Sequence, residues 1–364
     1  MAQKYAGELE SFYSLLTPRI KSDLPSWYGS EAHLVGEPTF HPRPWSYFFR
    51  YIVKVSDTKT KALLVKIRHT EGMGIGEAIA SGKISSEAAL EFESLMKIGI
   101  VFAAQEEASI FASIQPLAFY DEFNGVVTEE ADIRDLRSSY QSIGMWGRKK
   151  SHKAFEVHLY RTGRWLRVFH DQVGKVEEGP FFSEGHYHET LENLGTIEIS
   201  TSYSDLYLVR SLIKSLYQKH DSAALPQRSL HSDFNLANIF VTRDGRICSF
   251  DPKNDPGPVY IDLAKLITDM KTCRPQILTW GRHVSPALLQ VYDAALLKGY
   301  FGEEPVNFIA LNLYKLIHLI EKWAESEARL KSVTGMKKVL YMVGALQMRS
   351  YFMQLLRKQA VEYE

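Results

Sequence analysis

Apolar and polar residues alternate along the first part of the chain in a way that predicts short strands around one main helix. Four runs are rich in aromatic or β-branched residues and are bounded by polar segments, and each predicts a strand: 45–55, 62–68, 115–121 and 125–130. In 85–103, apolar residues recur at helical spacing, so this segment predicts a helix. From residue 286 onward the pattern is helical, and its apolar stripes predict a helix-bundle core.

A cluster of polar residues, each framed by apolar neighbours, lies between these two parts. His231 and Asp233 are followed by Asn238 five residues after the Asp, and Asp251 comes thirteen residues after that Asn. Phosphoryl transfer to a hydroxyl needs such a set. One carboxylate orients the hydroxyl and accepts its proton, while an Asn and a second carboxylate hold the magnesium that bridges the nucleotide phosphates. The pattern therefore indicates Asp233 as the catalytic residue and Asn238 and Asp251 as metal ligands.

The sequence between the two predicted metal ligands is typical of a β-hairpin. Residues 239–250 predict two short strands joined at an Asp-Gly turn. A hairpin places the end of its second strand beside the start of its first. We therefore expect Asn238 and Asp251 to be neighbours, as two ligands of one Mg²⁺ must be. His231 is expected to support the loop from behind rather than to act chemically.

Two other interpretations of the cluster are open at this point. In the first, its members are ordinary polar residues of a loop, since the H-x-D-x-x-x-x-N pattern alone is moderately common. In the second, His231 and Asp233 are ligands of a metallohydrolase. That site needs further His or carboxylate ligands at close spacing, and the neighbouring sequence offers none. The predicted hairpin and the position of Asp251 favour phosphoryl transfer over both.

The segment from Leu230 to Met270 resembles the catalytic core of the aminoglycoside phosphotransferase and choline kinase-like family, which has the protein-kinase fold. It shares the H-x-D-x-x-x-x-N pattern, the metal-binding Asp and an Asp-Leu-Ala segment at 262–264 that opens a helix. Two departures stand out. Ser232 occupies a position where the family usually has Gly, and Pro-Lys follows Asp251 in place of Phe-Gly, as in many small-molecule kinases.

The resemblance implies an α+β, two-lobed protein-kinase-like fold. Its N-lobe is a small antiparallel sheet with one main helix, and its C-lobe is larger and mostly helical. The implied organisation is a helical extension at 1–30 that ends near Pro25, a nucleotide-binding N-lobe at 31–130, and a catalytic and substrate-binding C-lobe at 131–364 with an insertion around 137–205. The family also implies that Asp262 braces the catalytic loop, which is a structural role.

The resemblance further implies residues that bind the nucleotide in the N-lobe. Lys66 ends an apolar run similar to the V-A-I-K strand of kinases, so it is expected to bind the α- and β-phosphates. Glu91 and Glu93 on the next helix are the candidates to pair with it, and the spacing to a core Leu favours Glu91. The strand at 125–130 resembles the last strand before the hinge. Backbone groups from Glu129 to Ala131 are therefore expected to bind the adenine.

Composition excludes several classes of protein. Lys plus Arg equals Asp plus Glu, at 43 each, and this balance argues against a nucleic-acid binder. The two cysteines argue against a disulfide framework and for a reducing, cytoplasmic compartment. No apolar run reaches the length of a transmembrane segment. Oligomeric state leaves no mark in the sequence.

The sequence as a whole predicts a phosphotransferase. We expect an ATP- and Mg²⁺-dependent kinase that transfers the γ-phosphoryl group to a hydroxyl of a small molecule: a sugar, an amino sugar, an aminoalcohol, or a glycan or lipid head group. A protein kinase is the first alternative. The short connection from Asp251 to Asp262 argues against it, because it leaves no room for a long activation loop. A non-catalytic nucleotide-binding protein of the same fold is the second, given Ser232 and the lack of a clean Gly-rich loop.

Overall fold

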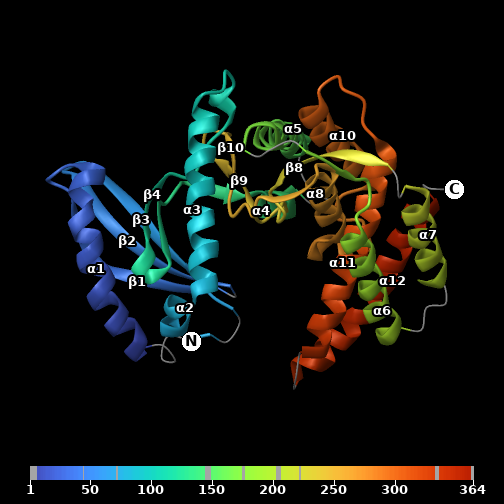
Figure 1. The fold of residues 1–364 in the computed structure, drawn as a ribbon, viewed down its shortest axis with the longest axis horizontal. Helices are drawn as coiled ribbons and strands as arrows, with labels where there is room; N and C mark the ends of the chain where they lie inside the picture. Colours follow the sequence, from blue (N-terminus) through green and yellow to red (C-terminus); the bar gives the residue numbers. More distant parts are fainter. Residues whose placement is uncertain are drawn as a thin grey trace. The chain divides into compact units, whose positions relative to one another are not determined.

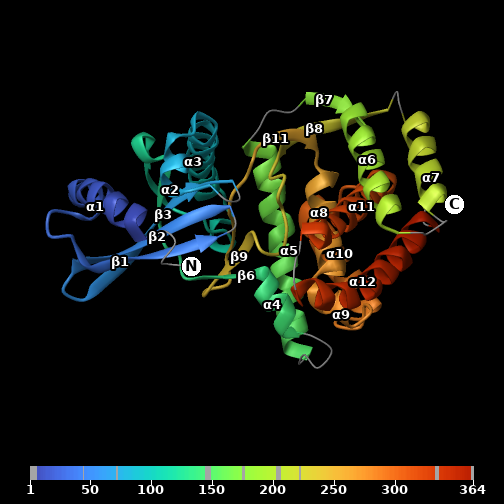
Figure 2. The ribbon, with the colours of Figure 1, turned by 90° about the horizontal axis from the view of Figure 1, so that it is seen from below.

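The computed structural model describes residues 6–43, 45–70, 73–143, 149–173, 177–201, 206–220, 223–332 and 336–361. The chain divides into two compact units, Met1–Ile133 and Arg134–Glu364. Figure 1 and Figure 2 show the elements of each unit.

The first unit is built on a five-stranded antiparallel sheet with the order β1-β2-β3-β5-β4. Its strands are β1 (His33–Arg43), β2 (Ser46–Ser56), β3 (Lys59–Arg68), β4 (Pro116–Tyr120) and β5 (Gly125–Glu129). Four of the five coincide with the runs predicted from sequence. The fifth, β1, was missed because it carries two prolines and mostly exposed side chains, as edge strands tolerate.

Two long helices cover the two faces of this sheet, α1 (Ala6–Tyr28) and α3 (Gly82–Ala103), with the short α2 (Ile75–Ala80) before α3. Helix α1 continues past Pro25, where the sequence predicted its end. Its apolar residues at every fourth position, from Phe12 to Leu24, pack into the core with Phe49 and Val65. A strand's side chains alternate between faces, so residues next to Val65 on β3 face α3 instead.

The second unit is mostly helical. Its helices are α4 (Leu136–Ile143), α5 (Lys149–Gln172), α6 (Glu184–Ser200), α7 (Leu206–Lys219), α8 (Tyr260–Thr272), α9 (Arg274–Leu278), α10 (Pro286–Phe301), α11 (Phe308–Ser332) and α12 (Met336–Val361). Two small sheets complete it, with the orders β10-β9-β6 and β11-β8-β7. Their strands are β6 (Ile133–Asp135), β7 (Glu177–Pro180), β8 (Ala224–Leu230), β9 (Ile239–Thr242), β10 (Ile247–Ser249) and β11 (Asp255–Pro258).

Helices α5 and α10 cross at two glycines that let their backbones touch. A Cβ atom added at Gly163 would lie 2.7 Å from the amide nitrogen of Tyr300, and one at Gly299 would meet the backbone of Tyr160. Any larger side chain at either position would therefore force the helices apart. Two turns beyond this crossing, α5 carries the fully buried His170 toward the loop that follows β8.

Among the described residues, no helix is both long enough and apolar enough to cross a bilayer.

Candidate active site

In the first unit, a buried ion pair holds the predicted phosphate-binding lysine. Lys66 lies on β3 and faces α3, where its Nζ donates a hydrogen bond of 2.8 Å to Oε1 of Glu91. The side chains of Lys66 and Glu91 are 6% and 1% exposed. The structure therefore pairs Lys66 with Glu91 rather than with Glu93, which is exposed on α3.

A second cation, which sequence reasoning missed, completes this cluster. Arg68 donates from Nε to the other carboxylate oxygen of Glu91 at 2.8 Å. Burial by itself would raise the pKa of the Glu91 carboxyl, but the attraction of Lys66 and Arg68 outweighs it, so the pKa lies below its usual value. The signal for Arg68 was available, because residues two apart on a strand share a face.

The segment predicted to bind adenine continues the hydrogen bonding of the sheet. The amide of Glu129 donates to the carbonyl oxygen of Gln115 at 3.0 Å, and the amide of Glu130 donates to that of Ala62 at 2.8 Å. These two N–H groups are therefore engaged within the first unit. The amide of Ala131 and the carbonyl groups of the segment are the atoms on which the adenine prediction now rests.

In the second unit, the buried carboxylate of Asp262 holds the loop that carries Asp233. Asp262 lies in the first turn of α8, and its two oxygens accept the amides of His231 at 2.7 Å and Ser232 at 2.9 Å. His170 lies 3.0 Å from the same carboxylate through Nε2, and its Nδ1 is 2.9 Å from the hydroxyl of Tyr300. Burial by itself would raise the pKa of Asp262, but the hydrogen bond with His170 outweighs it and lowers this pKa.

The loop's backbone explains why glycine suits position 232. Ser232 has a φ of +63°, in the left-handed region that a Cβ atom disfavours by about 1–2 kcal/mol. The hydrogen bond from the Ser232 amide to Asp262 holds the residue in this conformation. The carbonyl oxygen of Ser232 accepts a hydrogen bond of 2.5 Å from Nζ of Lys265, which lies one turn after Asp262 on α8.

Two amide side chains orient the predicted catalytic carboxylate. Asn235 donates from Nδ2 to Oδ1 of Asp233 at 2.7 Å, and Asn238 donates from Nδ2 to Oδ2 at 2.7 Å. Asn238 also donates to the backbone carbonyl of Asp233 at 3.0 Å. Sequence reasoning missed Asn235, although an Asn two residues after an Asp is typical of a local turn.

The predicted hairpin is confirmed, and it brings the two predicted metal ligands to the same end. Strands β9 and β10 pair antiparallel, with Ile239 opposite Ser249. Beyond that pair, the amide of Phe250 donates to the carbonyl of Asn238 at 3.0 Å, so Asp251 follows directly at the open end. Since the NH₂ group of Asn238 binds Asp233, its Oδ1 is the atom left to meet a cation.

Oxygen atoms of Asn238 and Asp251 fit a magnesium ion that also binds nucleotide phosphates and water, because Mg²⁺ takes few protein ligands in such sites. Across the described ranges, no group of three or more His, Cys, Asp or Glu side chains is arranged to hold a metal by itself.

His231 lies beneath the loop, fully buried among aromatic rings. Its Nε2 is 2.7 Å from the hydroxyl of Ser249 on β10, and its ring packs edge-on against Trp165 and Phe234. Burial lowers the pKa of His231, so the ring is neutral at physiological pH. The contacts of His231 thus join the loop that carries Asp233 to the hairpin.

No protein-family model matches the chain, and no curated protein does. Solved structures match over most of its length. A glucosamine kinase aligns with a TM-score of 0.54 at 10% identity, over 90% of this chain and 83% of its own. A choline kinase from Cryptosporidium parvum Iowa II aligns at 0.51 and 12% identity, over 95% and 97%. A choline/ethanolamine kinase family protein from Mesorhizobium loti aligns at 0.50 and 13% identity, over 95% and 98%.

Likeness at these identities establishes the fold. It confirms the two-lobed kinase-like architecture, with a sheet-built N-lobe and a helical C-lobe, that the resemblance of Leu230–Met270 implied. The chain therefore has the fold that the choline kinase-like proteins share.

Proposed function

We propose that the chain is an ATP- and magnesium-dependent kinase that transfers the γ-phosphoryl group to a hydroxyl of a small molecule. One observation carries this proposal: the half-buried carboxylate of Asp233 is oriented by Asn235 and Asn238 on a loop held by the buried Asp262. Similar solved structures are kinases of choline, ethanolamine and glucosamine, which supports a small-molecule acceptor.

In the proposed reaction, Asp233 orients the acceptor's hydroxyl and takes its proton. Each oxygen of Asp233 accepts one amide hydrogen bond and keeps a lone pair for the hydroxyl. The hydroxyl oxygen attacks the γ-phosphorus and forms a new P–O bond. The bond from the γ-phosphorus to the bridging oxygen breaks, and ADP leaves with that electron pair. Catalysis would come mainly from positioning and charge stabilisation.

The nucleotide and its metal have proposed partners in the chain. Lys66, fixed by Glu91, would bind the α- and β-phosphates, and backbone groups from Glu129 to Ala131 would bind the adenine. Asn238 and Asp251 would hold the magnesium ion, which neutralises phosphate charge when bound.

Two further observations bear on the alternatives. Residues between Asp251 and Asp262 form β11, which pairs with β8, so this connection is a sheet strand rather than a long activation loop. This weighs against a protein kinase. We also propose a cytoplasmic location, because Cys248 and Cys273 are both buried and form no disulfide, as is typical of a reducing compartment.

The test is ATP binding by calorimetry with and without Mg²⁺, in the wild type and in Asp251→Ala. We expect magnesium-dependent binding that the substitution removes. Turnover of ATP with small hydroxyl compounds should then be absent in Asp233→Asn. A wild-type chain that binds no ATP at millimolar concentration would contradict the proposal and favour a non-catalytic protein of the same fold.

A further inference from the structure

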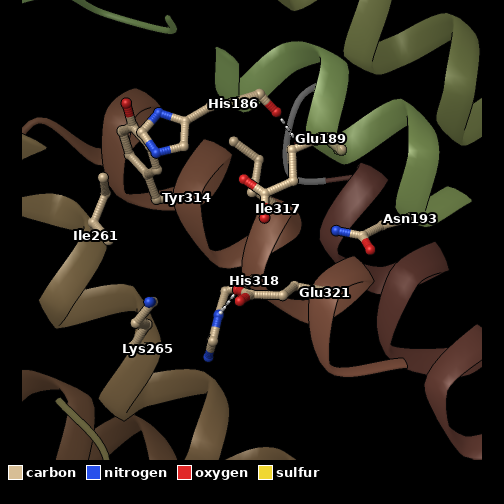
Figure 3. Close-up of a pocket in the computed structure, with 10 residues that line it drawn as sticks. His186, Glu189, Asn193, Ile261, Lys265, Tyr314, Ile317, His318 and Glu321 are labelled. Atoms are coloured by element: carbon tan, nitrogen blue, oxygen red, sulfur yellow. Dashed lines mark hydrogen bonds and ion pairs between the residues drawn. The ribbon is translucent and has the colours of Figure 1, made fainter. Parts of the chain in front are cut away.

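Helix α8 contributes residues to two cavities of the second unit. The smaller, of about 130 Å³, lies among α6, α8 and α11 and is lined by Lys265 in the first half of α8 (Figure 3). Lys265 also binds the carbonyl oxygen of Ser232, so this cavity adjoins the loop that carries Asp233. The larger, of about 310 Å³, is lined by Thr268 and Lys271 in the second half of α8, and the proposed function does not use it.

Five helices, from α8 to α12, contribute residues to the wall of the larger cavity. Its volume is at the lower end of the roughly 300–1,000 Å³ that sites for drug-sized ligands have. The cavity is therefore large enough for a ligand of one or two rings. Its lining combines buried apolar side chains with charged groups, as ligand sites commonly do.

The charged side chains of the larger cavity are mostly cations. Among the lining residues that the structure describes, they are Lys271, Asp293, Lys315 and Lys358. Nζ of Lys271 lies 3.2 Å from Oδ2 of Asp293, and Nζ of Lys315 donates to the uncharged Oδ1 of Asn312 at 2.8 Å. Three lysines against one aspartate give the lining an excess of two positive charges. Lys315 is half-buried, and partly desolvated charges require partners, so the lining favours an anion.

A tryptophan occupies an unusual backbone position at the same cavity. Just after α9, the amide of Trp280 donates to the carbonyl of Ile277 at 3.2 Å, and the amide of Gly281 donates to that of Gln276 at 2.8 Å. These are the two hydrogen bonds of a Schellman motif, in which the left-handed residue is usually glycine. Trp280 takes that position with a φ of +53°, which is rare for a bulky residue. Its side chain is nevertheless 47% exposed, and strained residues of this kind are typical of ligand sites.

The turn that carries Trp280 is packed against α12. A Cβ atom added at Gly281 would lie 3.3 Å from Cε2 of Tyr351, so the glycine lets the two segments approach. The hydroxyl of Tyr351 donates to the carbonyl of Lys271 at 2.8 Å, which ties α12 to α8. Burial raises the pKa of Tyr351, so the phenol keeps this proton. The indole is thus presented by a turn that is held from both sides.

The remaining lining gives the cavity an apolar part. Leu289 of α10 and Leu319 of α11 are buried and line the same space as Trp280. An indole accepts another ring by offset stacking or edge-on contact, and aliphatic side chains exclude water from such a ring. Trp280 and these leucines therefore suit an aromatic body, while the lysines suit an anionic group.

We propose that the larger cavity binds a small organic anion, a carboxylate or phosphate carried on an aromatic body of one or two rings. The body packs on Trp280, Leu289 and Leu319, and the anionic group accepts hydrogen bonds from Lys315 and Lys358. The inference does not depend on the proposed kinase function, because none of these residues belongs to the proposed nucleotide, metal or base positions.

A matched series of probes tests this chemistry by calorimetry. Naphthoate and naphthyl phosphate carry the two anionic groups, naphthamide carries no charge, and acetate has no ring. We expect the tighter of the two aromatic anions to have a Kd about 10-fold below that of naphthamide, the size expected of a charge-assisted hydrogen bond. Acetate should give no signal at the same millimolar concentration. A Kd for naphthamide as low as that of both anions, or binding of acetate as tight as theirs, would overturn the proposal.

Removal of single lysines locates the anionic group. Lys315→Gln should raise the Kd of the tighter anion by about 10-fold, and Lys358→Gln should raise it less, because that side chain is exposed. Neither change should affect naphthamide. Lys331→Gln, an exposed lysine further along α11, is the matched control and should bind like the wild type. An unchanged Kd for the anion in both cavity variants would overturn the assignment.

Two substitutions of Trp280 test the aromatic body. Trp280→Gly suits the left-handed backbone and removes the indole, and it should raise the Kd of the aromatic anion and of naphthamide by about 3- to 10-fold. Trp280→Phe keeps a flat ring and should raise both values less. Thermal unfolding on the same samples checks that each variant is folded. Wild-type affinity in Trp280→Gly would contradict the role of the indole.

Competition with nucleotide distinguishes the larger cavity from the proposed ATP site, which also takes an aromatic ring and an anionic group. The Kd of the aromatic anion should be the same with and without saturating Mg-ATP. Displacement of the probe by Mg-ATP would place it at the nucleotide site and overturn the inference, while the proposed kinase function would stand.

Discussion

The two clusters of predicted site residues stabilise their charges in different ways. In the first unit, Lys66 and Arg68 neutralise Glu91 directly, and the side chains of Lys66 and Glu91 are almost completely buried. In the second unit, the buried charge of Asp262 is stabilised by amides and an imidazole, while Asp233, the proposed base, is half-buried. In the first unit, the group proposed to bind a ligand, Lys66, is thus itself part of the buried core. In the second unit, the proposed group, Asp233, is half-buried and is a different residue from the buried Asp262. Mutations should therefore couple stability to function in the first unit and separate them in the second.

The largest expected effect is on turnover in the second unit. Asp233→Asn should lower kcat by about 10²–10⁴-fold, the range for loss of a positioned base. Nucleotide affinity and thermal stability should stay near those of the wild type, because Asp262 still holds the loop. The exposed Glu303→Gln, which also changes a carboxylate to an amide, is the matched control. Wild-type kcat in Asp233→Asn would contradict the assignment.

In the first unit, the same kind of change should affect the fold. Glu91→Ala leaves Lys66 and Arg68 without their shared partner, and breaking a buried ion pair costs about 3–5 kcal/mol. Urea unfolding should show this loss together with weaker ATP binding. Glu93→Ala, two residues along α3 and exposed, should change the free energy of unfolding by less than about 0.5 kcal/mol. Equal losses in the two variants would remove the contrast between the units.

The stabilising contribution of Glu91 should also depend on pH. Its pKa in the folded chain is lowered, so its contribution is fully present above the unfolded carboxyl value of about 4.3 and is lost as the pH falls toward the folded value. The difference in unfolding free energy between wild type and Glu91→Ala should therefore be constant near neutral pH and shrink in acid. A difference that grows as the pH falls would mean that the carboxyl is not held ionised.

The smallest expected effect is a gain in stability from the catalytic loop. Ser232→Gly removes the Cβ that disfavours a φ of +63°, and should raise the free energy of unfolding by up to about 1 kcal/mol. Ser232→Ala keeps the Cβ and should give no such gain. Thermal unfolding of the two variants distinguishes the backbone effect from loss of the hydroxyl, and an equal gain in both would assign it to the hydroxyl.

Sequence reasoning succeeded where the relevant residues are close together along the chain. The hairpin from Ile239 to Ser249 and the strand that carries Lys66 follow from local periodicity and turn chemistry. It failed for β1, whose prolines and exposed side chains give no strand pattern. Arg68 shares a face of β3 with Lys66, but it was overlooked because its pairing with Glu91 depends on the helix that packs on that face.

The cavity among α6, α8 and α11 is a feature that the sequence could not predict. Glu189 and Glu321 come from helices more than a hundred residues apart, and each alone is an ordinary helical glutamate. Packing of α6, α8 and α11 brings them to one space. The sequence could therefore predict residues that lie close together along the chain, but a cavity lined from several helices depends on packing.

The glycine crossing of α5 and α10 restricts which substitutions the chain can accept beneath the loop that carries Asp233. Tyr300 follows Gly299 directly, and His170 lies two turns after Gly163, so the crossing sets the separation at which these two side chains meet beneath Asp262. In a library of all single substitutions, Gly163 and Gly299 should therefore tolerate as few replacements as Asp233 does. A selection for activity would therefore identify both glycines as essential, although neither contributes a chemical group to the proposed reaction.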